Sequence, residues 1–268
     1  MESVPSDRRW VQAVLATLAT AALLYFGNGL DPLWPLMWFA TLPVLLLSLR
    51  TNAWTAVAAT IVATMLGGLN LWGYLTNTLG APAFAWVAVF LATGVALAAA
   101  VLLFRALILR GAVWRGLLAY PALWVTFEYL RNLTTPHGSA GSFAYSQLQF
   151  LTFLQLSSIT GPWGMSFILL LFAAALALGL HSRARSPKVA LRVVGTGVGV
   201  VLAVLLFGAV RLAIPQTEKV KVGLIASDAG TNLTVADPGQ DTERLFRDYA
   251  REAEKLAASG AHGMGTSQ

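Results

Sequence analysis

The sequence has no cysteine and few charges: 11% of its residues are charged, whereas an ordinary soluble domain carries roughly 25%. The missing cysteine excludes a disulfide scaffold and a cysteine-ligated metal site. With only three scattered histidines the chain offers no metal site, and we expect no cofactor. The low charge, with 57% hydrophobic residues and a mean hydropathy of +0.67, excludes a lone soluble globule and a disordered chain. The composition indicates a membrane protein whose nine tryptophans form aromatic belts.

Apolar runs predict seven membrane-spanning helices, because a span needs about 20 mostly apolar residues. The seven segments are Trp10–Phe26, Leu33–Leu49, Ala53–Leu75, Phe84–Phe104, Val113–Leu130, Trp163–Leu180 and Val193–Val210. The first is not a cleavable leader, since further spans follow it and no small-residue cleavage site is evident. The predicted fold is therefore mainly α, a polytopic helical membrane bundle.

Lysine and arginine are concentrated in alternate connections between these segments. Ten of them lie at the N-terminus and in every second connection: Arg8, Arg9, Arg50, Arg105, Arg110, Arg115, Arg183, Arg185, Lys188 and Arg192. The opposite connections hold only Arg131. Because positive connections stay in the cytoplasm, we expect a cytoplasmic N-terminus and a far-side location for the chain after Val210. The net charge of +6 thus reflects the orientation of the chain in the membrane and does not indicate a nucleic-acid-binding surface.

The composition changes after the last span, which predicts a helical membrane domain over residues 1–212, a linker over 213–218 and a second domain over 219–268. There, Val220–Ala226 alternates like a strand and Asp241–Ser259 has the pattern of an amphipathic helix. The apolar face of that helix is expected to hold Leu245, Phe246, Tyr249, Ala253 and Leu256, with Glu243/Arg247 and Arg244/Asp248 as ion pairs. About 50 residues are too few to complete an α/β domain, so an incomplete one is expected.

The connection over residues 132–161 is too long for a simple loop. Its apolar stretch Phe150–Leu156 is too short to span and predicts an interfacial or re-entrant helix.

Four short motifs add a more specific signal. They are WVTFEYLR at Trp124–Arg131, YSQ at Tyr145–Gln147, QL at Gln155–Leu156 and GPWGMSF at Gly161–Phe167. With these motifs, their spacing and the predicted span layout, the sequence resembles the apolipoprotein N-acyltransferase family. The resemblance implies a membrane domain followed by a carbon–nitrogen hydrolase (nitrilase-like) domain. It also implies transfer of an acyl chain from a phospholipid to the N-terminus of a lipoprotein.

The resemblance further implies a catalytic glutamate, lysine and cysteine, of which the cysteine carries the acyl group as a thioester. This chain has no cysteine, and where the family has a Pro-Glu motif it reads His262–Gln268 and ends. We therefore expect a C-terminally truncated, inactive form in which no catalytic residue can be named. The stretch His137–Phe143 departs from the family's aromatic motif, which leaves the acyl acceptor open.

Four residues are candidates for substrate binding: Glu128, Arg131, Tyr145 and Gln147. Glu128 and Arg131 are three residues apart and can pair on one helix face. They form either a polar rim above a lipid-entry cleft or a snorkelling pair that ends the helix. Tyr145 and Gln147 also have two interpretations. They line a site for a lipid head group or an acceptor peptide, or they belong to a turn whose side chains hydrogen bond to the buried backbone of the loop.

Two other patterns have simpler interpretations. His137 lies near several loop serines, but no G-x-S-x-G elbow supports a serine hydrolase. Gly195 and Gly199 lie inside an apolar span, so they indicate a helix-packing face rather than a phosphate loop.

Three functions therefore stay open. The first is the acyltransferase implied by the resemblance, with phospholipid and a lipoprotein acceptor as partners. The second is a non-catalytic membrane scaffold or lipid-binding protein. The third is a small-solute transporter, which is disfavoured because the charges lie near the span ends. We expect a monomer in the bacterial inner membrane with no nucleic-acid partner.

Overall fold

The computed structural model describes residues 6–135, 137–214, 223–225, 240–258 and 264–266. Contacts divide the chain into two compact units. The first contains Met1–Trp72 and Ala83–Ala213, and the second contains Gly73–Pro82 and Ile214–Gln268.

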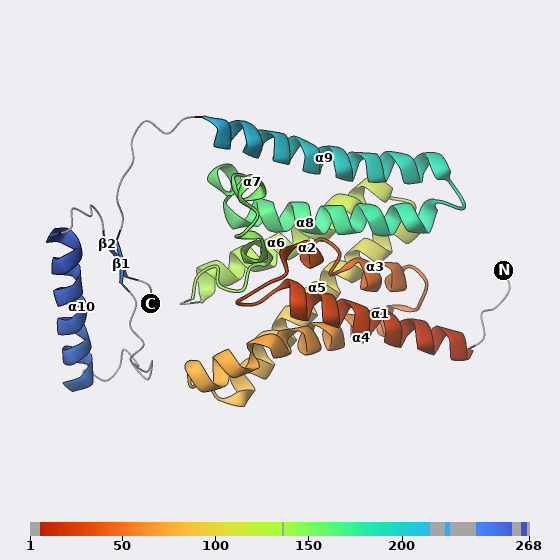
Figure 1. Cartoon of the computed structure of the whole chain (residues 1–268). Coiled ribbons are helices and arrows are strands. Elements are labelled where there is room, and N and C mark those ends of the chain that lie inside the picture. Colours follow the sequence, from red (N-terminus) through yellow and green to blue (C-terminus); the bar gives the residue numbers. More distant parts are fainter. Residues whose placement is uncertain (1–5, 136, 215–222, 226–239, 259–263, 267–268) are drawn as a thin grey trace. The chain divides into compact units, whose positions relative to one another are not determined.

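The first unit is a bundle of helices (Figure 1). Its longer helices are α1 (Ser6–Gly27), α4 (Ala53–Gly67), α5 (Ala83–Leu109), α6 (Val113–Thr134), α8 (Ser157–Ser182) and α9 (Pro187–Ala213). Its short helices are α2 (Trp34–Met37), α3 (Leu42–Ser48), η1 (Gly68–Leu71), η3 (Phe143–Gln147) and α7 (Leu151–Leu154). Helix α4 packs on α1 and α5, while α8 packs on α6 and α9. The short α3 contacts both α1 and α8, so it joins the two halves of the bundle.

Five helices of the described chain are long and apolar enough to cross a membrane. They are Trp10–Gly27, Ala53–Leu71, Ala83–Leu109, Ser157–Ser182 and Pro187–Ala213. The 27 residues of α5 span about 40 Å at 1.5 Å per residue, more than the roughly 30 Å of a bilayer core. The mainly α membrane domain predicted from the sequence is confirmed, with five of its seven segments meeting the requirements of length and hydropathy.

The other two predicted segments differ from simple spans. Leu33–Leu49 is broken, because α2 ends at Met37 and α3 begins at Leu42. Each of these helices has a proline in its first turn, where the missing N–H costs nothing and marks a helix start. The segment Val113–Leu130 forms α6, whose charges at Arg115 and Glu128 lower its hydropathy.

The core of the first unit lies where α5, α6 and α8 meet. Phe104, Tyr120 and Trp124 are completely buried there. The connection between α6 and α8 contributes to this core, since Phe143 of η3 stacks on Trp124 with ring centroids 4.4 Å apart. The segment predicted to be interfacial or re-entrant is thus packed against the bundle through buried side chains, including that of Phe153 in α7.

Helix α9 packs through other glycines than the sequence predicts. Apart from the chain neighbours of each glycine and the nearby backbone of α9 itself, no described atom lies within 4 Å of a Cβ built on Gly195 or Gly199. A Cβ on Gly197 would lie 2.7 Å from the Cβ of Ala175 in α8, and one on Gly208 would collide with the backbone of Thr152. The predicted packing face is therefore wrong, because Gly197 is turned about 200° from each neighbouring glycine of the motif.

The second unit contains a small β-α-β arrangement. It consists of β1 (Gly223–Ile225), α10 (Gln240–Ala258) and β2 (Met264–Thr266), together with the π-helical turn η2 (Tyr74–Thr78). The strands pair in parallel, with Leu224 opposite Gly265. Helix α10 matches the predicted helix within one residue at each end. Strand β1 lies within the predicted Val220–Ala226, whose other residues lie outside the described part of the chain.

Two details predicted for α10 are wrong. Phe246 is 73% exposed, whereas Tyr249, Ala253 and Leu256 are half-buried. Phe246 lies about 80° around the helix from Leu256, at the margin of the apolar face. The predicted pair Glu243/Arg247 is present. The carboxylate of Asp248, however, pairs with Arg251 at 3.2 Å instead of Arg244. These exposed pairs contribute little to stability.

Candidate functional site

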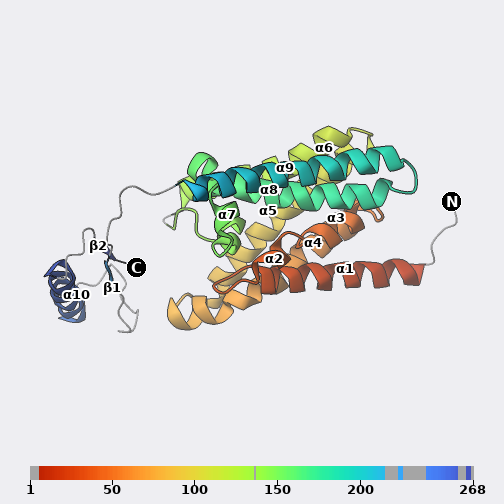
Figure 2. The ribbon, with the colours of Figure 1, turned by 45° about the horizontal axis from the view of Figure 1, so that its top comes forward.

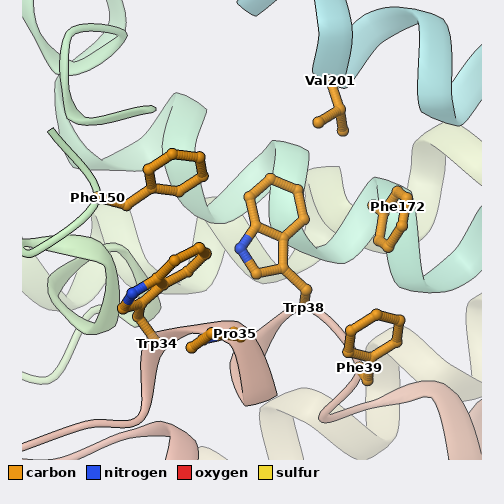
Figure 3. A pocket seen from close by; sticks show the side chains of 7 residues that line it. All are labelled: Trp34, Pro35, Trp38, Phe39, Phe150, Phe172 and Val201. Atoms are coloured by element: carbon orange, nitrogen blue, oxygen red, sulfur yellow. The ribbon is translucent and has the colours of Figure 1, made fainter. Parts of the chain in front are cut away.

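An open apolar groove lies on the first unit, where the broken second segment meets α8 and α9. Its walls are Trp34, Pro35, Trp38, Phe39, Phe150, Phe172 and Val201, as Figure 3 shows. The groove has a volume of about 260 Å³. None of these side chains carries a charge, so the groove suits an apolar ligand.

Aromatic contacts give the groove a fixed shape. The ring of Trp34 stacks on that of Phe150, with centroids 4.4 Å apart. Trp38 lies in the middle of the group (Figure 3). Its ring centroid is 4.9 Å from that of Phe153 and 5.4 Å from that of Phe172, which it meets edge-on. Such stacked and edge-on pairs are the preferred geometries of aromatic rings, so the groove is preformed.

The side-chain amide of Gln147 ties both tryptophans to η3. The indole Nε1 of Trp38 donates to Gln147 Oε1 at 2.9 Å. Gln147 Nε2 donates to the carbonyl oxygen of Trp34 at 2.9 Å and to Ser146 Oγ at 2.9 Å. The whole side chain of Gln147 is buried, where an unmet hydrogen bond would be costly. Gln147 therefore fixes α2 and the residue after it against η3.

The start of η3 is held by Glu128 in α6, which is 2% exposed. One carboxylate oxygen accepts a hydrogen bond of 2.9 Å from the backbone N–H of Phe143, and the other accepts one of 3.1 Å from Ser142 Oγ. The hydroxyl of Ser142 also lies 3.1 Å from that of Ser166 in α8. A carboxylate at a helix start accepts a hydrogen bond from a free backbone N–H and is attracted by the partial positive charge of the helix dipole. Glu128 thus joins α6, η3 and α8.

These contacts form a continuous polar path from Glu128 to the groove. Glu128 holds Ser142 and Phe143, and the carbonyl of Phe143 accepts a hydrogen bond of 2.7 Å from Ser146 Oγ. Ser146 in turn accepts from Gln147. Two of the four predicted site residues, Glu128 and Gln147, are therefore brought into one network, although neither lines the groove.

The other two predicted residues lie outside this path. Arg131 Nη2 donates to the carbonyl oxygen of Ala140 at 2.9 Å, and its guanidinium carbon lies 5.6 Å from the ring centre of Phe127. Within the described residues, Glu128 and Arg131 hydrogen bond to the loop and not to each other. Tyr145 is 37% exposed, and its hydroxyl lies 2.5 Å from Ser139 Oγ.

Sequence reasoning missed the aromatic wall of the groove. The available signal was the Trp34–Trp38 stretch, WPLMW, in which a proline interrupts an apolar run between two tryptophans. In the part of the chain that the structure describes, no three histidine or carboxylate side chains gather into a metal site. The described contacts thus provide an apolar surface with a buried polar support.

Most of this domain matches a known family. Residues 10–175 match the model of the apolipoprotein N-acyltransferase N-terminal domain. The chain is 26% identical to apolipoprotein N-acyltransferase 1 of Treponema denticola over 147 residues, which cover 50% of the chain and 25% of the relative. It is 30% identical to the apolipoprotein N-acyltransferase of Geobacter metallireducens over 148 residues, covering 54% of the chain and 28% of the relative.

The apolipoprotein N-acyltransferase of Bradyrhizobium diazoefficiens is also 30% identical, over 178 residues that cover 66% of the chain and 29% of the relative. The chain thus matches less than a third of the length of these curated relatives. The family match includes six of the seven groove residues and both ends of the polar path. Because that match extends over more than half of its residues, the chain belongs to the apolipoprotein N-acyltransferase family through its N-terminal domain.

Proposed function

We propose that this chain holds an acyl chain of a membrane phospholipid in the groove at Trp34 and Trp38, as the lipid-binding part of an apolipoprotein N-acyltransferase. In the reaction that the family name describes, the phospholipid would supply the acyl group and the N-terminus of a lipoprotein would accept it. The observation that carries the proposal is the uncharged aromatic groove, with its rings fixed by Gln147.

A rigid groove is the feature that lipid selection inside a membrane requires. Lipid tails are already in apolar surroundings, so burial of a tail against protein gains little by itself. Selection must come from close contact with a surface of fixed shape. The stacked pair of Trp34 and Phe150 and the edge-on pair of Trp38 and Phe172 supply such a surface.

We propose that the 268-residue chain binds lipid without becoming acylated. A thioester needs a thiol, and this sequence has no cysteine. The loop serines Ser142 and Ser146 do not offer a substitute, since both are buried and their hydroxyls are out of reach of a lipid ester. The uncharged groove also fits a second candidate function, that of a non-catalytic lipid-binding protein.

The membrane arrangement that we propose has seven crossings in a bacterial inner membrane. Helices α2 and α3 together form a broken second crossing, and α6 forms the fifth. The N-terminus is cytoplasmic and the chain after Val210 lies on the far side, as the distribution of lysine and arginine supports. Residues 1–212 form the membrane domain, and residues 219–268 begin a carbon–nitrogen hydrolase domain, which the parallel pairing of β1 and β2 supports.

A substitution that fills the groove tests the lipid-binding proposal. Val201 projects into the groove from α9 (Figure 3), and Val201→Trp should block it. The neighbouring Leu202 is 59% exposed and does not line the groove, so Leu202→Trp is a matched control with the same new side chain. We expect retention of a fluorescent phosphatidylethanolamine by the purified chain to fall about tenfold or more in Val201→Trp and to stay unchanged in Leu202→Trp. Equal retention by both variants would refute the proposal.

Mass spectrometry separates binding from chemistry. The chain incubated with labelled phospholipid should release all label on denaturation and show no added acyl mass. A covalent acyl adduct on any residue would contradict the non-covalent role.

A further inference from the structure

Positive side chains gather at one end of the first unit. The connections after α3, between α5 and α6, and between α8 and α9 carry them, and Figure 2 shows the end of α3 and the α8–α9 turn at the same end of the bundle. The cations of these connections and their flanks are Arg50, Arg105, Arg110, Arg115, Arg183, Arg185, Lys188 and Arg192. His181 lies in the last turn of α8 beside them.

Contacts at α3 bring the ends of α3, α5 and α8 together. Arg105 of α5 donates a hydrogen bond to the carbonyl oxygen of Ser48, the last residue of α3. Helix α3 also packs on α8, whose last turn holds His181 and is followed by Arg183 and Arg185. Arg50 and Arg185 are exposed, so their guanidinium groups are available to a ligand.

The three connections contain no acidic residue of their own. Between Asp31 and Glu218 the sequence contains one carboxylate side chain, that of Glu128, which is occupied by Ser142 and Phe143. The ion pairs of the described residues all lie within α10, so none involves these cations. Like charges repel one another, and an anion bound between them would relieve the repulsion.

Exposed tryptophans place the cluster at the level of lipid phosphates. Trp54 in the first turn of α4 is 83% exposed, and Trp114 in the first turn of α6 is 48% exposed. Tryptophan concentrates at the boundary between hydrocarbon and water. Trp54 lies just after the turn that contains Arg50, and Trp114 precedes Arg115 directly, so these cations lie where head groups lie.

We propose that this cluster, centred on Arg50, Arg105, His181, Arg185 and Lys188, binds the phosphate of an anionic phospholipid. Basic pockets between spans are suited to such head groups because charge attraction adds to the apolar contact of the tails. The cluster has none of the residues of the aromatic groove, so it is a second lipid site that does not depend on the acyl-binding proposal.

The test compares two lipids that differ in head-group charge. The purified full chain in neutral detergent is titrated with short-chain phosphatidylglycerol and, separately, with phosphatidylcholine of the same tails. We expect phosphatidylglycerol to bind about tenfold more tightly, since each cation near a surface adds to the attraction. The variant Arg50→Gln/Arg185→Gln/Lys188→Gln should lose that preference.

A charge-matched control separates the site from the net charge. Arg244→Gln/Arg247→Gln/Arg251→Gln removes the same charge from α10 and should retain the preference. Equal binding of both lipids by the unmodified chain, or loss of the preference in the α10 variant, would overturn the proposal. Displacement of the lipid by equimolar inorganic phosphate would also overturn it, by assigning a free-anion site. Thermal unfolding checks both variants, and the single variants Arg50→Gln and Arg185→Gln should each lose part of the preference.

Discussion

The indole nitrogen of Trp38 donates a hydrogen bond of 2.9 Å to the side-chain oxygen of Gln147, across 109 residues of sequence. Both partners are buried, and Gln147 also holds the backbone of Trp34. This contact joins the break between α2 and α3 to the loop that precedes α8. The shape of the groove therefore depends on a residue that does not line it.

Gln147→Leu should distort the groove. Leucine has a similar size but leaves the indole N–H of Trp38 and the carbonyl of Trp34 without their buried partner. We expect the free energy of unfolding to fall by about 2 kcal/mol and phospholipid retention to fall with it. Gln155→Leu is the control, because the amide of Gln155 hydrogen bonds only at exposed positions. Equal thermal stability of the two variants would show that the Gln147 contacts are unimportant.

Glu128→Leu should release the start of η3. It removes both acceptors of the Phe143 N–H and the Ser142 hydroxyl, and hydrogen bonds to a charged group each contribute about 1.5–3 kcal/mol. Glu128→Gln keeps the shape and one acceptor oxygen, so its loss should be clearly smaller. Hydrogen exchange at the Phe143 amide measures the effect directly. Exchange that is unchanged in Glu128→Leu would rule out this role.

Two glycines on α9 provide a matched comparison of packing. Gly197→Ala adds a methyl group 2.7 Å from the Cβ of Ala175 and should lower the free energy of unfolding by about 1–3 kcal/mol. Gly195→Ala adds the same group where the described neighbours leave space, and it should be neutral or stabilising by roughly 0.5 kcal/mol. Thermal unfolding in detergent distinguishes them. The reverse order of stability would mean that α9 packs through the opposite face.

Reporter fusions test the proposed orientation. Fusions after Lys188, in the first turn of α9, and after Lys219, beyond its last residue, should report opposite compartments. Lys188 should be cytoplasmic, because the connections rich in lysine and arginine remain inside. Reports from the same compartment would refute a crossing at α9.

The sequence was sufficient to predict the features that depend on amino-acid composition and on the regular spacing of apolar and charged residues. The long apolar runs predict α1, α4, α5, α8 and α9, and the charge pattern of Asp241–Ser259 predicts α10. Two prolines could also have revealed the break in Leu33–Leu49, since Pro35 and Pro43 each lie in the first turn of a helix. Hydropathy averaged over a window hides such a break.

The site was less predictable because its contacts join distant residues. The motif containing Glu128 and Arg131 suggests a local pair, yet both side chains turn toward the loop at residues 140–143. Whether Gly195 or Gly197 faces α8 depends on the rotation of α9 about its axis. The sequence does not specify that rotation, because α9 has apolar residues on all of its faces. The groove was missed because its aromatic residues look like ordinary span residues until α8 and α9 are placed beside them.

The hydrogen bond between Gln147 and the Trp34 carbonyl sets an order of assembly. A ribosome makes α1 to α5 long before Gln147, so the break after α2 enters the membrane with that carbonyl and the Trp38 indole unsatisfied. Unpaired polar groups are costly in hydrocarbon, and the early segments would stay loosely placed at the membrane surface or be shielded by the insertion machinery. Closure of the groove must then wait until α6 and the following loop arrive, which makes the lipid site one of the last parts of the bundle to form.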